Sequence, residues 1–315
     1  INYKPVERSP ITFTYRGYNV HSMPPASSGG VAIAGILNQL ENIKLNNLDY
    51  QGAKHMHFVV ESERRVYSDR AKYMGDSDFI FVPINTLISK EYAQKRWKSV
   101  DSLLASKSSV ISHGEVPDIY KESEETTHYS VVDKWGNAVS VTTTINGWFG
   151  NGIVVDGAGF LLNNEMDDFS SKPGFPNAYG LIGNEANAIG PSKRMLSSMS
   201  PSIVENANGD LFLVVGSPGG STIITTTAQV IMNVIDFGMS IEDAVENPRF
   251  HHQWLPDVIQ IEKNRFSIEV VQALQNMGHS VKYRDAIGEA NCIMIKEGLI
   301  YGAADSRRNS SAMGY

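Results

Sequence analysis

The amino-acid sequence predicts a fold of the α+β class, in which helices and strands are mixed along one chain. Apolar residues recur every three or four positions over residues 29–46, a spacing typical of an amphipathic helix. Residues 126–133 and 138–144 alternate polar and apolar side chains and flank a Lys-Trp-Gly-Asn turn, which predicts a β-hairpin. A short apolar strand at 211–215 is followed by a helical pattern at 222–237. Both kinds of element therefore contribute to the fold.

The remaining elements follow from the same patterns. A second helix is predicted over residues 55–73, and its charged run at 61–65 is interpreted as a solvated face. Ser240 and Asp243 form a capping-box pattern for a short helix. A helix at 267–277 and strands at 279–283, 291–296 and 299–302 complete the set. Residues 106–125 and 169–198 are polar or rich in Gly, Pro, Asn and Ser, and are predicted to be long connections.

Composition excludes several classes of protein. The chain has 315 residues, of which 42% are hydrophobic and 19% charged, with a formal charge of −7 and no basic block. A nucleic-acid partner is disfavoured, because phosphate neutralisation needs clustered Lys and Arg. Cys292 is the single cysteine, lies in an apolar run, and is predicted to be a small buried side chain. No run approaches the ~18 apolar residues of a spanning helix, and we expect no membrane span.

The beginning of the sequence is typical of the middle of a protein. Residues 1–5 read Ile-Asn-Tyr-Lys-Pro and have no feature of a signal peptide. We therefore expect further sequence upstream.

Thr126 is the first candidate for catalysis. It begins the predicted hairpin directly after a polar connection of the kind that proteases cut. A threonine at a new N-terminus has its own base, because an α-amine titrates near ~7.7–8.0 and can accept the hydroxyl proton. The same residues also suit an ordinary Thr-rich strand.

Three further segments could carry chemistry. Gly-Ser-Pro-Gly-Gly at 216–220, between a strand and a helix, could present backbone N–H groups to an oxyanion, or could be a bare turn. The acids and amides at 163–168 could bind an amine or a cation, or could form a solvated turn. Ser197 and Ser198 lack a Gly-x-Ser-x-Gly context, and His251 and His252 are interpreted as structural.

Taken in order, five motifs resemble the gamma-glutamyltranspeptidase family. They are Thr-Thr-His-Tyr-Ser at 126–130, Asn-Asn-Glu-Met-Asp-Asp at 163–168, Leu-Ser-Ser-Met-Ser-Pro at 196–201, Gly-Ser-Pro-Gly-Gly at 216–220 and Pro-Arg-Phe-His-His-Gln-Trp at 248–254. Upstream, Met-Pro-Pro-Ala-Ser-Ser-Gly-Gly at 23–30 and Asp-Arg at 69–70 resemble the end of that family's large subunit. The resemblance implies a four-layer αββα sandwich of the N-terminal-nucleophile hydrolase type, incomplete at its N-terminus.

The resemblance also implies self-cleavage between Glu125 and Thr126. Residues 1–125 would then be the C-terminal part of a large subunit, and residues 126–315 the complete small, catalytic subunit. The large-subunit part is shorter than the family pattern. The arginine that grips the substrate α-carboxylate in the family is not assigned to any residue of this chain.

The family's functional residues carry over to matching positions. Thr126 would attack the γ-carbonyl, Thr144 would orient it, Gly219 and Gly220 would form the oxyanion hole, Asn146, Glu165 and Asp168 would hold the α-amine, Ser197 and Ser198 would bind the α-carboxylate, and Tyr179 would gate the pocket. Two positions depart from the family. Met195 stands where proline is usual, and Thr222 where arginine is common.

The resemblance implies transfer or hydrolysis of γ-glutamyl groups from glutathione or glutamine. Water, an amino acid or a peptide would be the acceptor, with no cofactor and no metal, and the protein would be periplasmic or secreted. The rest of the large subunit would be its partner. The alternatives are a related acylase, a poly-γ-glutamate depolymerase, or an inactive fragment that needs the upstream segment.

Overall fold

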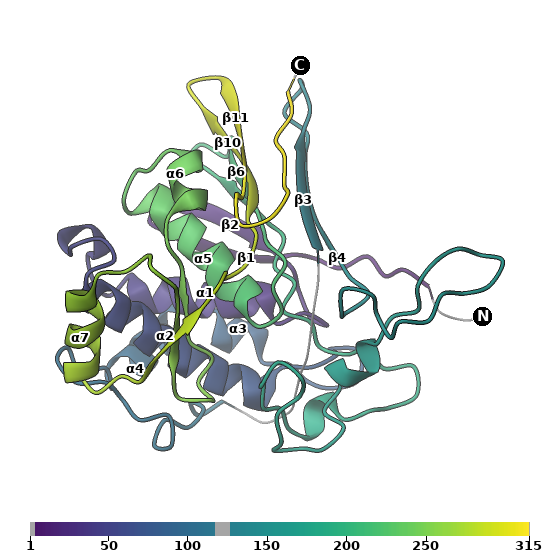
Figure 1. Ribbon diagram of the computed structural model, residues 1–315, viewed down its shortest axis with the longest axis horizontal. Coiled ribbons are helices and arrows are strands. Elements are labelled where there is room, and N and C mark those ends of the chain that lie inside the picture. The colour runs from purple at the N-terminus through teal and green to yellow at the C-terminus, as the bar shows by residue number, and fades with distance from the viewer. Residues whose placement is uncertain (1–3, 117–126, 315) are drawn as a thin grey trace.

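The computed structural model describes residues 4–116 and 127–314 of the chain (Figure 1). The helices are α1 (Gly29–Leu40), α2 (Ala53–Tyr73), α3 (Ile84–Leu87), α4 (Lys90–Trp97), α5 (Thr222–Ile235), α6 (Ile241–Glu246) and α7 (Ile268–Asn276), with 3-10 turns η1 (Leu45–Asn47), η2 (Glu165–Asp168) and η3 (Glu185–Asn187). The strands are β1 (Ile11–Tyr15), β2 (Tyr18–Ser22), β3 (Thr127–Val132), β4 (Ala138–Thr143), β5 (Ser202–Glu205), β6 (Leu211–Val215), β7 (Phe250–His251), β8 (Ile259–Glu262), β9 (Val281–Arg284), β10 (Asn291–Lys296) and β11 (Leu299–Ala304). The α+β class is confirmed.

A six-stranded sheet forms the middle of the molecule. Its strand order is β1-β2-β5-β6-β10-β11, and all of its neighbouring strands are antiparallel. The sheet therefore joins three distant stretches of sequence. Cys292 of β10 is buried at 2% exposure, as predicted, opposite Ala303 of β11.

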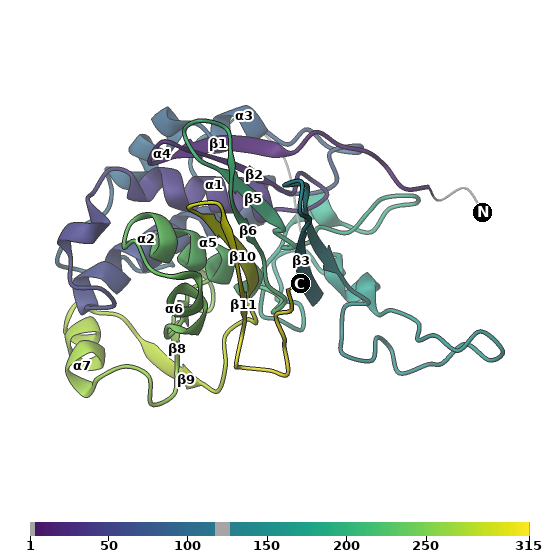
Figure 2. The same ribbon diagram turned by 90° about the horizontal axis from the view of Figure 1, so that it is seen from above.

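Helices cover one face of this sheet and the β3–β4 hairpin covers the other. Figure 2 shows α1, α2 and α5 on one side and β3 on the opposite side. Ser130 of β3 donates through Oγ to the carbonyl of Asn291 at 2.9 Å, and Ser140 of β4 donates to the carbonyl of Val215 at 3.3 Å. These bonds hold the predicted hairpin against β10 and β6.

The outward face of the hairpin is apolar and open. Tyr129, Val131 and Val139 point away from the six-stranded sheet and are about half exposed. The described residues thus supply three layers, namely helices, the large sheet and the hairpin, of the four that the sequence predicts.

The prediction of a solvated charged face on α2 is wrong. Glu61, Arg64 and Arg65 are at most 1% exposed. Arg65 donates to Glu61 at 2.6 Å and Arg64 donates to it at 3.3 Å, while Arg64 also pairs with Asp257. This face is buried because Asp257 and the segment after α4, with Ser99 and Ser106, lie against it, and these residues are too far away in sequence for a helical pattern to reveal.

The remaining helix predictions agree with the structure except at one helix end. The predicted helix at 29–46 ends at Leu40, and a 3-10 turn follows at Leu45–Asn47. Ser240 caps α6 as predicted, since its Oγ accepts from the Asp243 amide at 3.1 Å. A three-stranded sheet of β7, β8 and β9 lies beside α7, and its β8–β9 pair is parallel.

Candidate functional site

The candidate site begins where the hairpin ends. Thr127 is the first residue of β3 and pairs with Thr143, the last residue of β4. Thr144, the predicted orienting residue, follows directly, and its Oγ accepts from the Asn146 amide at 2.8 Å. Glu125 and Thr126 lie outside the described residues.

Asn146 has a constrained conformation and a fixed side chain. Its φ of +66° is uncommon for a residue other than glycine, and it is 4% exposed. Its Nδ2 donates to the carbonyl of Asn164 at 3.1 Å, and its Oδ1 accepts from the Tyr179 hydroxyl at 3.4 Å. The predicted gate residue Tyr179 is therefore tied to the predicted amine-binding residue.

The two predicted acidic residues lie on the 3-10 turn η2. Asp168 is 2% exposed, and its carbonyl accepts from Asn187 Nδ2 at 2.6 Å. Burial raises the pKa of Glu165 above its usual value. Asp168 and Glu165 line a pocket of about 490 Å³ together with Thr144 and Ser197.

The serine pair is built against the segment before α1. The Ser28 amide donates to the carbonyl of Ser197 at 2.7 Å, and the Ser27 hydroxyl donates to the same carbonyl at 2.8 Å. Ser198 is fully buried, and its Oγ accepts from Arg70 Nη2 at 2.8 Å. Ser197 therefore lines the pocket, whereas Ser198 lies behind it in contact with Arg70.

The backbone conformation at residues 219 and 220 requires glycine at both positions. Gly219 has φ +135° and Gly220 has φ +59°, in the region that disfavours side chains. A Cβ on Gly219 would lie 2.5 Å from Thr222 Oγ1 and 3.2 Å from Gly288 Cα. Thr222, one of the departures from the family pattern, donates through Oγ1 to the Gly219 carbonyl at 2.7 Å and so braces this turn at the start of α5.

A second pocket, of about 390 Å³, lies beside the first. Its lining includes Thr127, Thr144, Asn146 and Gly219. Thr144 lines both pockets, so the structure brings together most of the predicted site around the end of the hairpin. The linings of these two pockets do not include Gly220, Tyr179 or Ser198 among the described residues.

Two arginines at the larger pocket were missed by sequence reasoning. Arg8 and Arg194 line it together with the acids, and both lie within ion-pair distance of Asp78, at 2.6 Å and 3.4 Å. Arg8 stands in polar sequence and carries no motif, and Arg194 follows Lys193 just before the Leu-Ser-Ser-Met-Ser-Pro motif without being part of it. Arg70 could have been found, because the Asp-Arg pair at 69–70 belongs to the resemblance.

His128 supports the site from below the hairpin. Its ring lies over Gly216, where an added Cβ would fall 2.3 Å from the imidazole. Its Nδ1 is 2.9 Å from Thr142 Oγ1 and its Nε2 is 3.1 Å from Ser130 Oγ. Burial lowers the pKa of His128 to about 4, so the ring is neutral at pH 7. Its role is to pack against Gly216 and not to transfer protons.

Comparison with known proteins gives this arrangement a context. The family model described as gamma-glutamyltranspeptidase matches residues 1–315. A glutathione hydrolase proenzyme from Escherichia coli K12 is 51% identical over 306 residues, covering 97% of this chain and 52% of the relative. A solved gamma-glutamyltranspeptidase structure from Helicobacter pylori is 57% identical with a TM-score of 0.56, covering 58% of this chain and all of that one. A cephalosporin acylase structure from Bacillus halodurans is 26% identical with a TM-score of 0.83, covering 100% of this chain and 55% of that one.

The shared structures define the class as N-terminal-nucleophile hydrolases. Within that class, the chain belongs to the gamma-glutamyltranspeptidase family. It spans about half the length of the curated relatives it matches. No helix among the described residues is long and apolar enough to cross a membrane.

Proposed function

We propose that the protein containing this chain transfers or hydrolyses γ-glutamyl groups of small compounds such as glutathione or glutamine. Water or an amino acid or peptide would accept the acyl group from Thr126. The relatives named glutathione hydrolase proenzyme support this function and support self-cleavage. By the same relationship we propose a periplasmic or secreted location.

The observation that carries the proposal is the convergence of Thr144, Glu165, Asp168 and Ser197 on one pocket. A γ-glutamyl group ends in an ammonium and a carboxylate on the same carbon. The buried carboxyl group of Asp168 suits the ammonium, and the Ser197 hydroxyl suits the carboxylate. Arg70 acts behind Ser198, which it holds through a bond of 2.8 Å.

The proposed steps centre on Thr126, which directly precedes the described strand β3 in sequence. After cleavage, its amine would accept the hydroxyl proton as Oγ attacks the γ-carbonyl, and would return that proton to the amide nitrogen of the donor as the C–N bond breaks. Thr127 pairs with Thr143, and Thr126 precedes Thr127 in sequence as Thr144 follows Thr143, which supports a partnership of Thr126 with Thr144. The amides of Gly219 and Gly220 would stabilise the oxyanion, where one such donor contributes about 3–4 kcal/mol.

The division at residue 126 has support from the comparisons. Residues 126–315 number 315 − 125 = 190, or about 60% of the chain. The solved chain from Helicobacter pylori is covered completely by 58% of this one. Residues 1–125 would be the end of the large subunit.

We propose that the rest of the large subunit is the partner. The open apolar face of the hairpin, with Tyr129, Val131 and Val139, supports this. The chain alone would then turn over γ-glutamyl substrates poorly. The test is hydrolysis of a chromogenic γ-glutamyl anilide by the 315-residue chain, alone and with the missing segment added. Full activity without that segment would contradict the partner proposal.

The second candidate function is that of an acylase. It is favoured by the cephalosporin acylase structure, in which 55% of the chain overlaps the whole of this one. The anilide assay separates the two when run beside an N-acyl amide whose acyl group lacks the α-amine. Preference for the substrate without an α-amine would favour the acylase, because Asp168 would then have no ammonium to pair with.

A further inference from the structure

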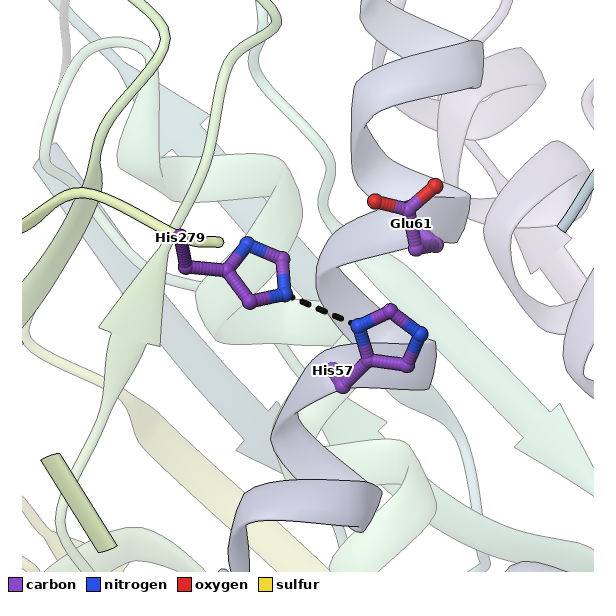
Figure 3. Close-up of side chains that lie close together, drawn as sticks. All are labelled: His57, Glu61 and His279. Atoms are coloured by element: carbon purple, nitrogen blue, oxygen red, sulfur yellow. Dashed lines mark hydrogen bonds between the residues drawn. The ribbon is translucent and has the colours of Figure 1, made fainter. Parts of the chain in front are cut away.

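A second cluster of chemical groups lies away from the candidate site. His57, Glu61 and His279 are buried together where α2 faces the segment between α7 and β9 (Figure 3). His57 Nδ1 is 2.8 Å from His279 Nε2, and one candidate ligand atom from each of the three residues lies within 4.8 Å of the others. Figure 1 places α7 at one edge of the molecule, away from β3.

Hydrogen bonding determines which nitrogen of His57 faces the cluster. Nε2 of His57 lies 2.7 Å from the backbone carbonyl of Asp101, and a carbonyl only accepts, so Nε2 carries the proton. Nδ1 therefore presents its lone pair to the cluster. A backbone carbonyl that orients an imidazole in this way is the usual outer-shell partner of a metal-bound histidine.

His279 can present a lone pair to the same point. Without a metal its Nε2 must donate to His57 Nδ1, because that nitrogen has no proton. Its Nδ1 has no hydrogen-bond partner among the described residues, so moving the proton there breaks no other bond.

We propose that His57 Nδ1, His279 Nε2 and one Glu61 oxygen form a binding site for a divalent transition-metal ion of the zinc type. Two imidazoles and a carboxylate are ligands that such ions accept, and a water molecule would take the fourth position. The histidine and glutamate of α2 stand four residues apart and so share one helix face. The two nitrogens would separate to about 3.3 Å to meet tetrahedral bonds of about 2.0–2.1 Å.

The surrounding charges limit the affinity of this site. Arg65 donates to Glu61 Oε2 at 2.6 Å, and Arg64 Nε and the Ser106 amide donate to Oε1 at 3.3 Å and 3.0 Å. Arg64 is also paired with Asp257, which offsets its charge. A cation must share the Glu61 carboxylate with these donors, so the affinity belongs in the micromolar range and not with that of structural zinc sites.

The test is calorimetric titration of the purified, EDTA-treated protein with zinc chloride. We expect one binding event with a micromolar Kd, a rise in Tm with zinc, and visible absorption of a low-coordinate site with Co²⁺. His57→Gln and His279→Gln should each weaken binding by about 100-fold or more. These readouts do not involve enzymatic activity, so the outcome is independent of the proposed function.

His55→Gln is the matched control. His55 lies two residues earlier on α2 and is equally buried, but it is outside the cluster. It should keep the wild-type affinity. Circular dichroism identifies a variant that does not fold, and the other cluster variant then decides the result. Absence of zinc binding by the wild type, or wild-type affinity in a folded cluster variant, would overturn the proposal.

Discussion

The helical side and the hairpin side of this molecule differ in the kind of side chain that they bury and expose. On α2, the charged residues Glu61, Arg64 and Arg65 are fully buried and meet their partners within the described chain. On the hairpin, the apolar Tyr129 and Val131 are half exposed. The first region is a packed interior with its charges paired. The second is an exposed apolar surface of the kind found at interfaces. Thr144 and Asn146 follow the hairpin directly, so the proposed activity depends on the less complete half of the fold.

The largest expected effect is at the start of the hairpin. Thr126→Ala should abolish both self-cleavage and γ-glutamyl turnover, because the attacking hydroxyl serves both steps. Intact mass and a γ-glutamyl anilide assay measure the two outcomes. Thr127→Ala, one residue further into β3, is the control and should still be cleaved. Normal processing of Thr126→Ala would remove Thr126 from the mechanism.

The next effect is at Asp168, where the hairpin side meets the pocket. Asp168→Asn should lower kcat/KM by about 30- to 5,000-fold, since leaving a buried ammonium without its counter-charge costs about 2–5 kcal/mol. Tm should change little. Asp167→Asn, its less buried neighbour on η2, is the comparison and should stay near wild type. If Asp168→Asn lowers Tm strongly and leaves the kinetics unchanged, the residue is structural.

Substitutions on the helical side should change the stability of the fold and not substrate binding in the pocket lined by Glu165 and Asp168. Glu61→Gln should destabilise the fold by about 3–5 kcal/mol, because Arg65 loses its buried counter-ion. Denaturant unfolding at pH 7 measures this. Glu91→Gln, an exposed partner of Lys95 on α4, should change stability by less than about 0.5 kcal/mol.

The same residue predicts a pH dependence. Burial opposes ionisation of Glu61, but Arg64, the Ser106 amide and Arg65 outweigh it and lower its pKa from 4.5 to about 2. A lowered folded-state pKa stabilises the protein above the unfolded value, and that stabilisation is lost as pH falls from about 4.5 through about 2. The difference between wild type and Glu61→Gln should therefore shrink in acid. A difference that grows in acid would mean that Glu61 is protonated in the native state at pH 7.

The smallest effect is expected on the outer face of the hairpin. Val131→Ser should change the stability of this chain by less than about 0.5 kcal/mol, because the side chain is already half exposed. Leu213→Ala, fully buried in β6, should cost about 2–5 kcal/mol. Val131→Ser should instead weaken association with the rest of the large subunit. A loss at Val131 as large as that at Leu213 would show that the hairpin face is already packed.

Much of the architecture could be predicted from local patterns. The helix at 53–73 and the β3–β4 hairpin follow from apolar periodicity, and Ser240 follows from its capping pattern. The β1–β2 hairpin was not predicted. Its turn uses Arg16 at φ +51° where glycine or asparagine is the usual signal, so only Gly17 marks it.

Within the candidate site, the predictable part was the set of motifs and not their contacts. Glu165, Asp168 and Ser197 came from matched segments, and the structure brings them to one pocket. That Ser198 would lie behind the pocket against Arg70 depends on packing between residues 128 positions apart. The buried charges of α2 were misjudged for the same reason, because burial of a helix face depends on elements that the periodicity of one helix does not describe.

The reactivity of the single cysteine can report on opening of the central sheet. Cys292 sits in β10 between β6 and β11 at 2% exposure, and burial raises the pKa of its thiol to about 12. Only the exposed thiolate reacts with alkylating reagents, so labelling must wait until these strands separate. The rate of modification under native conditions therefore measures how often the sheet opens. Recording that rate with and without the partner segment would show whether binding of that segment to the hairpin changes how often the six-stranded sheet opens.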